Sequence, residues 1–174
     1  MGLFSSSEKL YTFKDLLHHE LRDLYSAESQ LIHALPKMRD AANDEQLKRA
    51  FEMHLEETKN QKERLVEIGR MLQIDVDGDK CKAMAGLVAE GEEIIKSKSD
   101  PAVKDAALIG ASQRVEHYEI AAYGTANNYA KQLGLSEVSA LLSETEDEEK
   151  RTDQKLNQLA TGGINERART TVKS

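Results

Sequence analysis

The chain has 174 residues, 39% hydrophobic and 32% charged, with two prolines, no tryptophan and a formal net charge of −7. This length suits one domain with its own core, and the hydrophobic content is too high for a disordered chain. The negative charge disfavours nucleic acid and anionic membranes as partners. Cys81 stands alone, no stretch reaches the roughly 20 apolar residues of a membrane span, and no secretory signal opens the chain, so we expect a cytoplasmic protein.

The first predicted element is a long helix from about Thr12 to about Ala42, because apolar residues recur at helical spacing and not in the alternation of a strand. Thr12 is its expected N-cap, and Pro36 should kink the helix or remove one hydrogen bond. One row of residues should face inward: Leu17, Leu21, Leu24, Glu28, Leu31 and Leu35.

A turn near "ANDE" leads to a second long helix, whose inward row is polar in its middle. This row consists of Leu47, Phe51, His54, Thr58, Gln61, Leu65, Ile68 and Leu72. The following "QIDVDGDK" is an acidic loop, but the position of Gly78 does not fit an EF-hand, so we expect no calcium site there. "CKAMAGLVAEGEEIIKS" then predicts a shorter helix on one side of the molecule.

Asp100 and Pro101 predict the start of the third long helix, and Gly134 predicts its end. Its expected inward row is Ile109, Gln113, Glu116, Ile120, Tyr123, Asn127 and Ala130. The fourth long helix should end before "TGG" and turn inward Val138, Leu142, Thr145, Glu149, Thr152, Leu156 and Leu159.

These elements predict an all-α fold, a four-helix bundle with one long crossover that carries the extra short helix. We expect the bundle to span residues 1–162 and residues 163–174 to form a mobile C-terminal tail.

Each long helix loses its apolar character near the middle of its inward row, at Glu28, between His54 and Gln61, at Glu116 to Glu119, and at Glu149. If neighbouring helices run in opposite directions, these polar positions lie at similar depth. Buried carboxylates need a proton, a basic partner or a cation, and Lys and Arg are scarce at these positions. The pattern therefore predicts bound metal, and an oxygen-rich site suits iron or manganese.

The alternative for any single glutamate is a solvated position at the edge of the helix. Glu28, Glu57, Glu116 and Glu149 together favour the buried cluster, because they lie on four different helices at matching depth. His54 has three interpretations: a metal ligand, a hydrogen-bond donor to a ligand, or a core histidine. We expect no ligand role for the other histidines, which are His18, His19, His33 and His117.

Four segments carry a family resemblance: "LRDLYSAESQLIHALPKM", "HLEETKNQ", "DAALIGASQRVEHYEIAAYGT" and "LLSETEDEEKRTD". They resemble the helices of the YciF-like bacterial stress proteins, a branch of the ferritin-like superfamily, and the resemblance spans nearly all of residues 8–160. It implies a ferritin-like four-helix bundle that holds two divalent metal ions and forms a homodimer. The cellular role of this family is poorly defined.

The resemblance extends to individual ligands. "AESQ" is similar to the first ligand-bearing helix of rubrerythrins, which implies Glu28, and "VEHYE" is similar to their third helix, which implies Glu116 and Glu119. The family pattern Glu-x-x-His is broken, since Asn60 and Thr152 stand where histidines would follow Glu57 and Glu149. His54 and Glu146 instead lie one helical turn before Glu57 and Glu149, respectively. The predicted metal ligands are Glu28, His54, Glu57, Glu116, Glu119 and Glu149.

Two functions follow as hypotheses. The first is a di-metal oxidoreductase that reacts with peroxide or O2, in which Tyr25 and Tyr123 either donate hydrogen bonds to the site or only fill the core. The second is a non-enzymatic dimeric structural or binding protein whose metals stabilise the bundle. Iron storage would need a shell of many subunits. No nucleophile with its base, phosphate-binding glycine loop or H-E-x-x-H motif is present in the sequence, which excludes hydrolases and kinases.

Overall fold

The computed structural model describes residues 10–171, so the ends of the predicted domain and tail, 1–9 and 172–174, fall outside it. The elements are α1 (Phe13–Ala41), α2 (Glu45–Leu72), α3 (Lys82–Lys96), α4 (Pro101–Gln132), α5 (Ser136–Leu159), the π-helical turn η1 (Ala160–Ile164) and α6 (Asn165–Thr170). Residues 10–171 contain no strand, and no helix in this range is long and apolar enough to cross a membrane. The predicted all-α class is confirmed.

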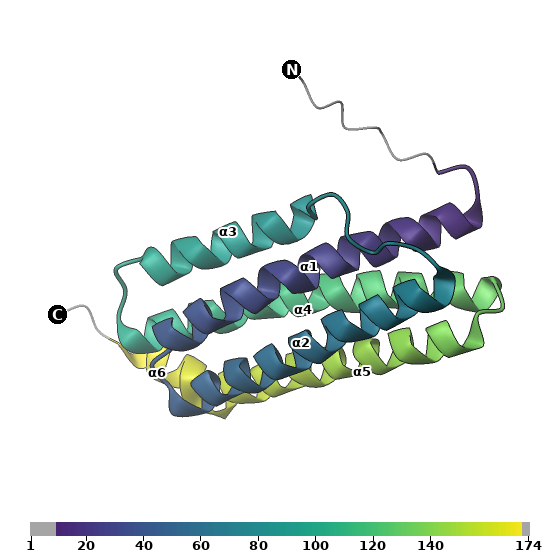
Figure 1. Ribbon diagram of the computed structural model, residues 1–174. Coiled ribbons are helices and arrows are strands. Elements are labelled where there is room, and N and C mark those ends of the chain that lie inside the picture. Colours follow the sequence, from purple (N-terminus) through teal and green to yellow (C-terminus); the bar gives the residue numbers. More distant parts are fainter. Residues whose placement is uncertain (1–9, 172–174) are drawn as a thin grey trace, which may run out of the picture.

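Four long helices form the bundle (Figure 1). α1 packs on α2, α4 packs on α5, and the two pairs meet through contacts of α1 with α4 and of α2 with α5. The connection from α2 to α4 carries α3, which lies outside the bundle against α1 and α4. The predicted ferritin-like bundle, with a short helix in its crossover, is therefore confirmed.

Local sequence signals determine where the helices begin and end. The side chain of Thr12 accepts a hydrogen bond from the backbone N–H of Asp15, whose own carboxylate accepts from the N–H of Thr12, so the N-terminus of α1 is a complete capping box. Asp100 caps α4 with Pro101 in the first turn. After α4, Gly134 adopts φ +71°, a left-handed conformation that glycine accepts without steric cost. These predicted caps are confirmed.

The inward face of α4 differs in part from the predicted row. Gln113 and Ile120 are only half-buried, whereas Ser112 and Glu119 are fully enclosed. The physical reason is that α4 contacts α1, α3, α5 and α6, so its buried surface is much wider than the single row of an amphipathic helix.

The C-terminal segment also differs from the prediction. A tail was expected from residue 163, but η1 runs through "TGG" and α6 follows, with α6 packed against α4. Gly163 has φ +139°, which permits the kink between the two helical segments. Ile164 is buried in the core, and Arg167 forms an ion pair with Asp44 at the start of α2.

The apolar core consists of two clusters, one toward each end of the bundle. The first cluster includes Leu31, Leu35, Phe51, Leu108, Ile109 and Leu156. The second includes Leu17, Leu21, Leu65, Ile68, Tyr123 and Leu142. Most of the buried polar residues fall between them along the long helices, as Glu28 does between Leu24 and Leu31, whereas Asp105, Asn127 and Ser139 lie within or beyond the apolar clusters. The bundle therefore has a polar layer across its middle.

Candidate metal centre

Four buried side chains from three helices converge in this polar layer. They are His54 of α2, Glu116 and Glu119 of α4, and Glu149 of α5. One potential ligand atom from each lies within 4.8 Å of those of the others, and no residue of the four is more than 2% exposed. Glu116 and Glu119 share a face of α4 because residues three apart in a helix project in similar directions. The arrangement could hold a metal ion.

Most of the ligand atoms lack a hydrogen bond. The buried atoms without a partner are Nδ1 and Nε2 of His54, Oε2 of Glu116, both carboxylate oxygens of Glu119, and Oε2 of Glu149. Nε2 of His54 lies 3.3 Å from Oε1 of Glu116 and 3.9 Å from Oε2 of Glu149. Within residues 10–171, no lysine or arginine forms an ion pair with these carboxylates. Unpaired buried oxygens and one imidazole are a donor set that fits a cation.

The electrostatics of the cluster favour protonated carboxyl groups when no cation is bound. Burial raises the pKa of Glu119 well above its ordinary value, and the charges of Glu28, Glu149 and Glu116 raise it further. Burial likewise raises the pKa of Glu149. Burial alone would lower the pKa of His54, but the adjacent carboxylates raise it well above the ordinary value.

Glu28 of α1 is a fifth buried residue beside this group. Its Oε1 accepts a hydrogen bond of 2.5 Å from the hydroxyl of Tyr123, while its Oε2 has no partner. Burial raises the pKa of Glu28 to about 8, although the hydrogen bond from Tyr123 acts in the opposite direction. Glu28 is not among the four residues whose ligand atoms lie within 4.8 Å, yet its charge raises the pKa of Glu119. It supplies a further carboxylate at the α1 side of the layer.

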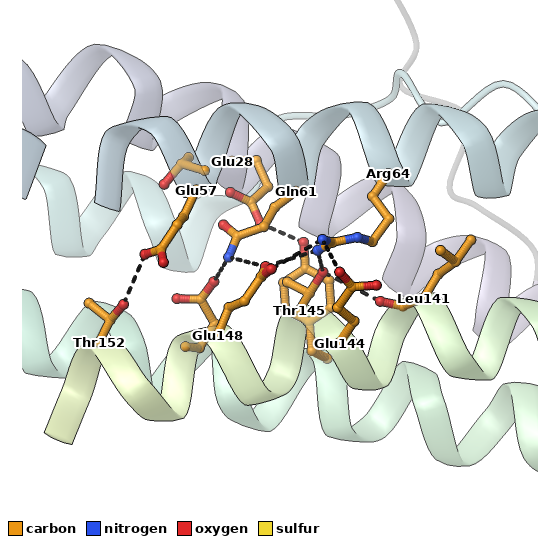
Figure 2. A network of polar contacts seen from close by, with 12 residues as sticks. Glu28, Glu57, Gln61, Arg64, Leu141, Glu144, Thr145, Glu148 and Thr152 are labelled. Carbon is orange, nitrogen blue, oxygen red and sulfur yellow. Dashed lines mark hydrogen bonds and ion pairs between the residues drawn. The ribbon is translucent and has the colours of Figure 1, made fainter. Parts of the chain in front are cut away.

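Glu57 does not join the buried cluster, in contrast to the prediction. Its side chain is 38% exposed, and its Oε2 lies 3.9 Å from Nδ1 of His54. The hydroxyl of Thr152 donates to the same oxygen at 3.5 Å (Figure 2). In this part of α2 it is His54 that faces the cluster, because it continues the buried row that begins at Leu47 and Phe51. Glu57 lies at the edge of that row and reaches solvent.

Hydrogen bonds to the carboxylates come from residues that the sequence did not assign to the site. The hydroxyl of Ser112 donates to Oε1 of Glu116 at 3.3 Å. Nε2 of Gln61 donates to Oε1 of Glu149 and, at 3.1 Å, to Oε2 of Glu148. The sequence could have assigned Gln61 to the site, because it is a polar residue in the predicted inward row of α2.

Arg64 closes the polar layer on the side of Gln61 (Figure 2). Its guanidinium donates to Glu148 at 2.9 Å, to Glu144 at 3.0 Å and to the hydroxyl of Thr145. Because Gln61 also contacts Glu148, hydrogen bonds connect Arg64 through Glu148 and Gln61 to the buried Glu149. Nothing in the spacing of apolar residues indicated this role for Arg64, which is not in an inward row.

The other residues considered in the sequence lie outside the cluster. Glu146 pairs with Lys150 at 2.7 Å. Tyr25 is half-buried, and the ammonium group of Lys62 lies 4.8 Å from the centre of its ring. His117 is exposed, with Nε2 3.5 Å from Asp153. The remaining positions are the half-buried His18 and the exposed His19, His33 and Asn60.

These features place the protein in the class of all-α helical bundles that have a crossover helix and a buried cluster of carboxylates and histidine. The family described as a domain of unknown function, DUF892, matches residues 12–169, and the chain belongs to this family. The chain is 47% identical over 158 residues to protein YciF of Escherichia coli (strain K12), across 90% of this chain and 95% of that protein. The predicted family resemblance is therefore confirmed.

Solved structures share the fold. The crystal structure of the E. coli stress protein YciF has a TM-score of 0.87 and 46% identity, with 90% of this chain and 99% of that chain covered. YcfI of Rhodopseudomonas palustris has a TM-score of 0.83 and 41% identity, with coverages of 89% and 98%. A protein of Xanthomonas campestris pv. campestris, 21% identical with a TM-score of 0.69 and coverages of 91% and 99%, shares the fold alone.

Proposed function

We propose that this protein is a di-metal carboxylate protein of the bacterial stress response that reacts with peroxide or O2. Two divalent ions, iron or manganese, occupy the polar layer of the bundle. The residues that would hold them are Glu28, His54, Glu116, Glu119 and Glu149.

The observation that carries this proposal is the set of buried ligand atoms without hydrogen bonds. Burying an ionised carboxylate without a charge partner costs several kcal/mol, and the layer brings together four carboxyl groups, of which Glu119 has no hydrogen bond and the other three have one free oxygen each. Two divalent cations carry the charge that balances four carboxylates. A single imidazole among oxygen donors suits iron or manganese better than a thiolate-preferring metal.

When bound, such metals supply the electrons for reduction of peroxide or O2. The chain itself prepares the site in three ways. Tyr123 holds a proton at Oε1 of Glu28, Ser112 orients Glu116, and Gln61 orients Glu149. The two apolar clusters exclude water from the layer along both directions of the bundle axis.

The assignment to stress response is supported by the relative from E. coli, which is described as a stress protein. Cytoplasmic location, homodimer formation and the absence of nucleic-acid and membrane partners are part of the same proposal. They can be tested by cell fractionation, by light scattering and by binding assays with DNA and lipid vesicles.

Metal analysis of protein purified without chelator tests the metal centre directly. We expect two equivalents of iron or manganese per chain and consumption of peroxide, both lost in Glu116→Ala. Glu57→Ala serves as the control, because Glu57 lies outside the buried group and its removal should leave the metal content unchanged. Full metal content and turnover in Glu116→Ala would contradict the proposal.

A second candidate function is structural. YcfI carries the provisional description of a structural protein, and in this chain Gln61 and Arg64 of α2 bond to acidic residues of α5 across the bundle. In that case we expect one tightly held ion per chain, no consumption of peroxide, and a large decrease in melting temperature when a chelator removes the ion.

A further inference from the structure

A groove between α2 and α5 opens beside the buried cluster and has a volume of about 530 Å³. This volume is in the range of small-molecule sites. The inner end of the groove is polar and includes His54, Ser112 and Thr152. The groove lies on the side of the layer where Glu57 and Thr152 meet, opposite to the side that Arg64 closes (Figure 2).

Three basic side chains line the groove: Arg49 of α2 and Arg151 and Lys155 of α5. All three residues are exposed, and within residues 10–171 they form no ion pair or side-chain hydrogen bond. Arg151 and Lys155 lie four residues apart, so they project from the same face of α5. Arg151 interacts electrostatically with Glu57 inside the groove and Arg49 with Glu45 beside it, so the positive charge gathered here is balanced only in part.

The balance of charge in the groove favours an anion. In the part of the chain that the structure describes, Glu57 is the only acidic residue that lines it, so this lining carries two net positive charges before His54 is considered. The carboxylate of Glu57 accepts a hydrogen bond from Thr152.

Apolar side chains also line the groove: Ala50, Phe51, Met53 and Leu156. Phe51 and Leu156 are each only 1% exposed, so the accessible apolar surface comes from Met53, which is 66% exposed, and from the half-buried Ala50. A small inorganic anion would leave this surface in contact with water. A hydrocarbon group would cover it and gain free energy in proportion to the apolar area buried.

We propose that this groove binds an organic monoanion, a carboxylate with a short hydrocarbon chain. The carboxylate lies among Arg49, Arg151 and Lys155, and the hydrocarbon chain lies against Ala50 and Met53. This site goes beyond the proposed metal function and does not require a bound metal. It would place an organic ligand next to His54, at the edge of the metal centre.

Titration of octanoate into metal-free protein, followed by calorimetry and by the methyl NMR signals of Ala50 and Met53, tests the site. We expect saturable binding, and weakening by about tenfold or more in the double variant Arg151→Gln/Lys155→Gln, which corresponds to loss of about 1.4 kcal/mol. The matched control is Arg70→Gln/Lys131→Gln, two exposed basic residues outside the groove. The control changes the net charge equally and should bind octanoate like the unmodified chain.

Three results would overturn the inference: no saturable binding up to about 10 mM octanoate, equal weakening in both double variants, or binding of acetate and inorganic phosphate as tight as that of octanoate. The melting temperatures of all variants show whether they remain folded. Failure of the metal analysis would leave this test unaffected, because the titration uses protein without metal.

Discussion

The hydroxyl of Tyr123 donates a hydrogen bond to Oε1 of Glu28, and Oε2 of the same carboxylate has no hydrogen-bond partner. One oxygen is thus satisfied by the protein and the other is available to a cation. Tyr123 is completely buried, and burial raises the pKa of its hydroxyl well above the ordinary value, so it acts as a donor throughout the physiological range.

Replacement Tyr123→Phe should therefore destabilise the metal-free protein. Removing the donor leaves Oε1 of Glu28 buried without a partner, which costs about 1–3 kcal/mol. Urea unfolding of the two proteins measures this difference. Tyr129→Phe is the control, because the half-buried Tyr129 has no hydrogen bond through its hydroxyl within residues 10–171. An equal effect of both substitutions would contradict the role of Tyr123.

The stability of the metal-free protein should fall as pH rises from about 4.5 to about 8. Burial raises the pKa of Glu28 from 4.5 to about 8, so the folded state binds more protons than the unfolded state in this window. The raised pKa values of Glu119 and Glu149 also make stability fall as pH rises, and the raised pKa of His54 does so above its ordinary pKa of 6.5.

The stabilisation that bound metal adds should instead rise with pH, because cations compete with protons for these carboxylates. The increase in melting temperature on addition of iron(II) or manganese(II) should thus grow from pH 5 to pH 8. Scanning calorimetry of both forms measures it. An increase that is independent of pH would show that the metal binds elsewhere.

Replacement Glu119→Gln should stabilise the metal-free protein at pH 8 while weakening metal binding. Both oxygens of Glu119 are buried without a partner, and an amide of similar shape needs no proton to be neutral on folding and can donate to neighbouring carboxylates. We expect a gain of about 1–3 kcal/mol in the free energy of unfolding. The exposed Glu67→Gln should change it by less than about 0.5 kcal/mol. Loss of stability in metal-free Glu119→Gln would contradict this picture.

Arg64 should contribute more to stability than an exposed basic residue on the same helix. Its side chain is 13% exposed and its partner Glu148 is 15% exposed, and Gln61 also depends on this carboxylate for its orientation. Arg64→Gln should cost about 1–3 kcal/mol in chemical unfolding. Among the residues that the structure describes, Lys59 pairs only with the exposed Glu56, so Lys59→Gln should cost about 0–0.5 kcal/mol. Similar costs for the two variants would show that the Arg64 network adds little.

The fold could be predicted from the sequence because the signals that define its helices act over short distances along the chain. Apolar spacing, the caps Thr12 and Asp100, and Gly134 each act within a few residues, and they predicted the long helices of the bundle. The helix α6 was missed because its order depends on distant partners. Ile164 needs the core and Arg167 needs Asp44, and neither contact is visible in a pattern of neighbouring residues.

Only part of the candidate site could be predicted, because the sequence indicates which residues of one helix face inward but not how two helices meet. Polar positions within inward rows identified Glu28, Glu116 and Glu149, because a row defines the direction of a side chain. Glu57 was included for its carboxylate and for its place in the middle of α2, although the row itself runs through His54. Hydrogen bonds across helices, such as that of Gln61 with Glu149, depend on rotations of two helices together, which the sequence of one helix cannot specify.

The separation of the apolar core into two clusters has a consequence for folding. Each cluster can hold the helices together at its own end of the bundle, while the metal-free middle is weakened by carboxyl groups that must take up protons to be buried. Bound ions would join the two halves into one cooperative unit. The lifetime of the protein in a cell would then follow the supply of metal, and a shortage would expose the chain to proteases first at the centre of its helices.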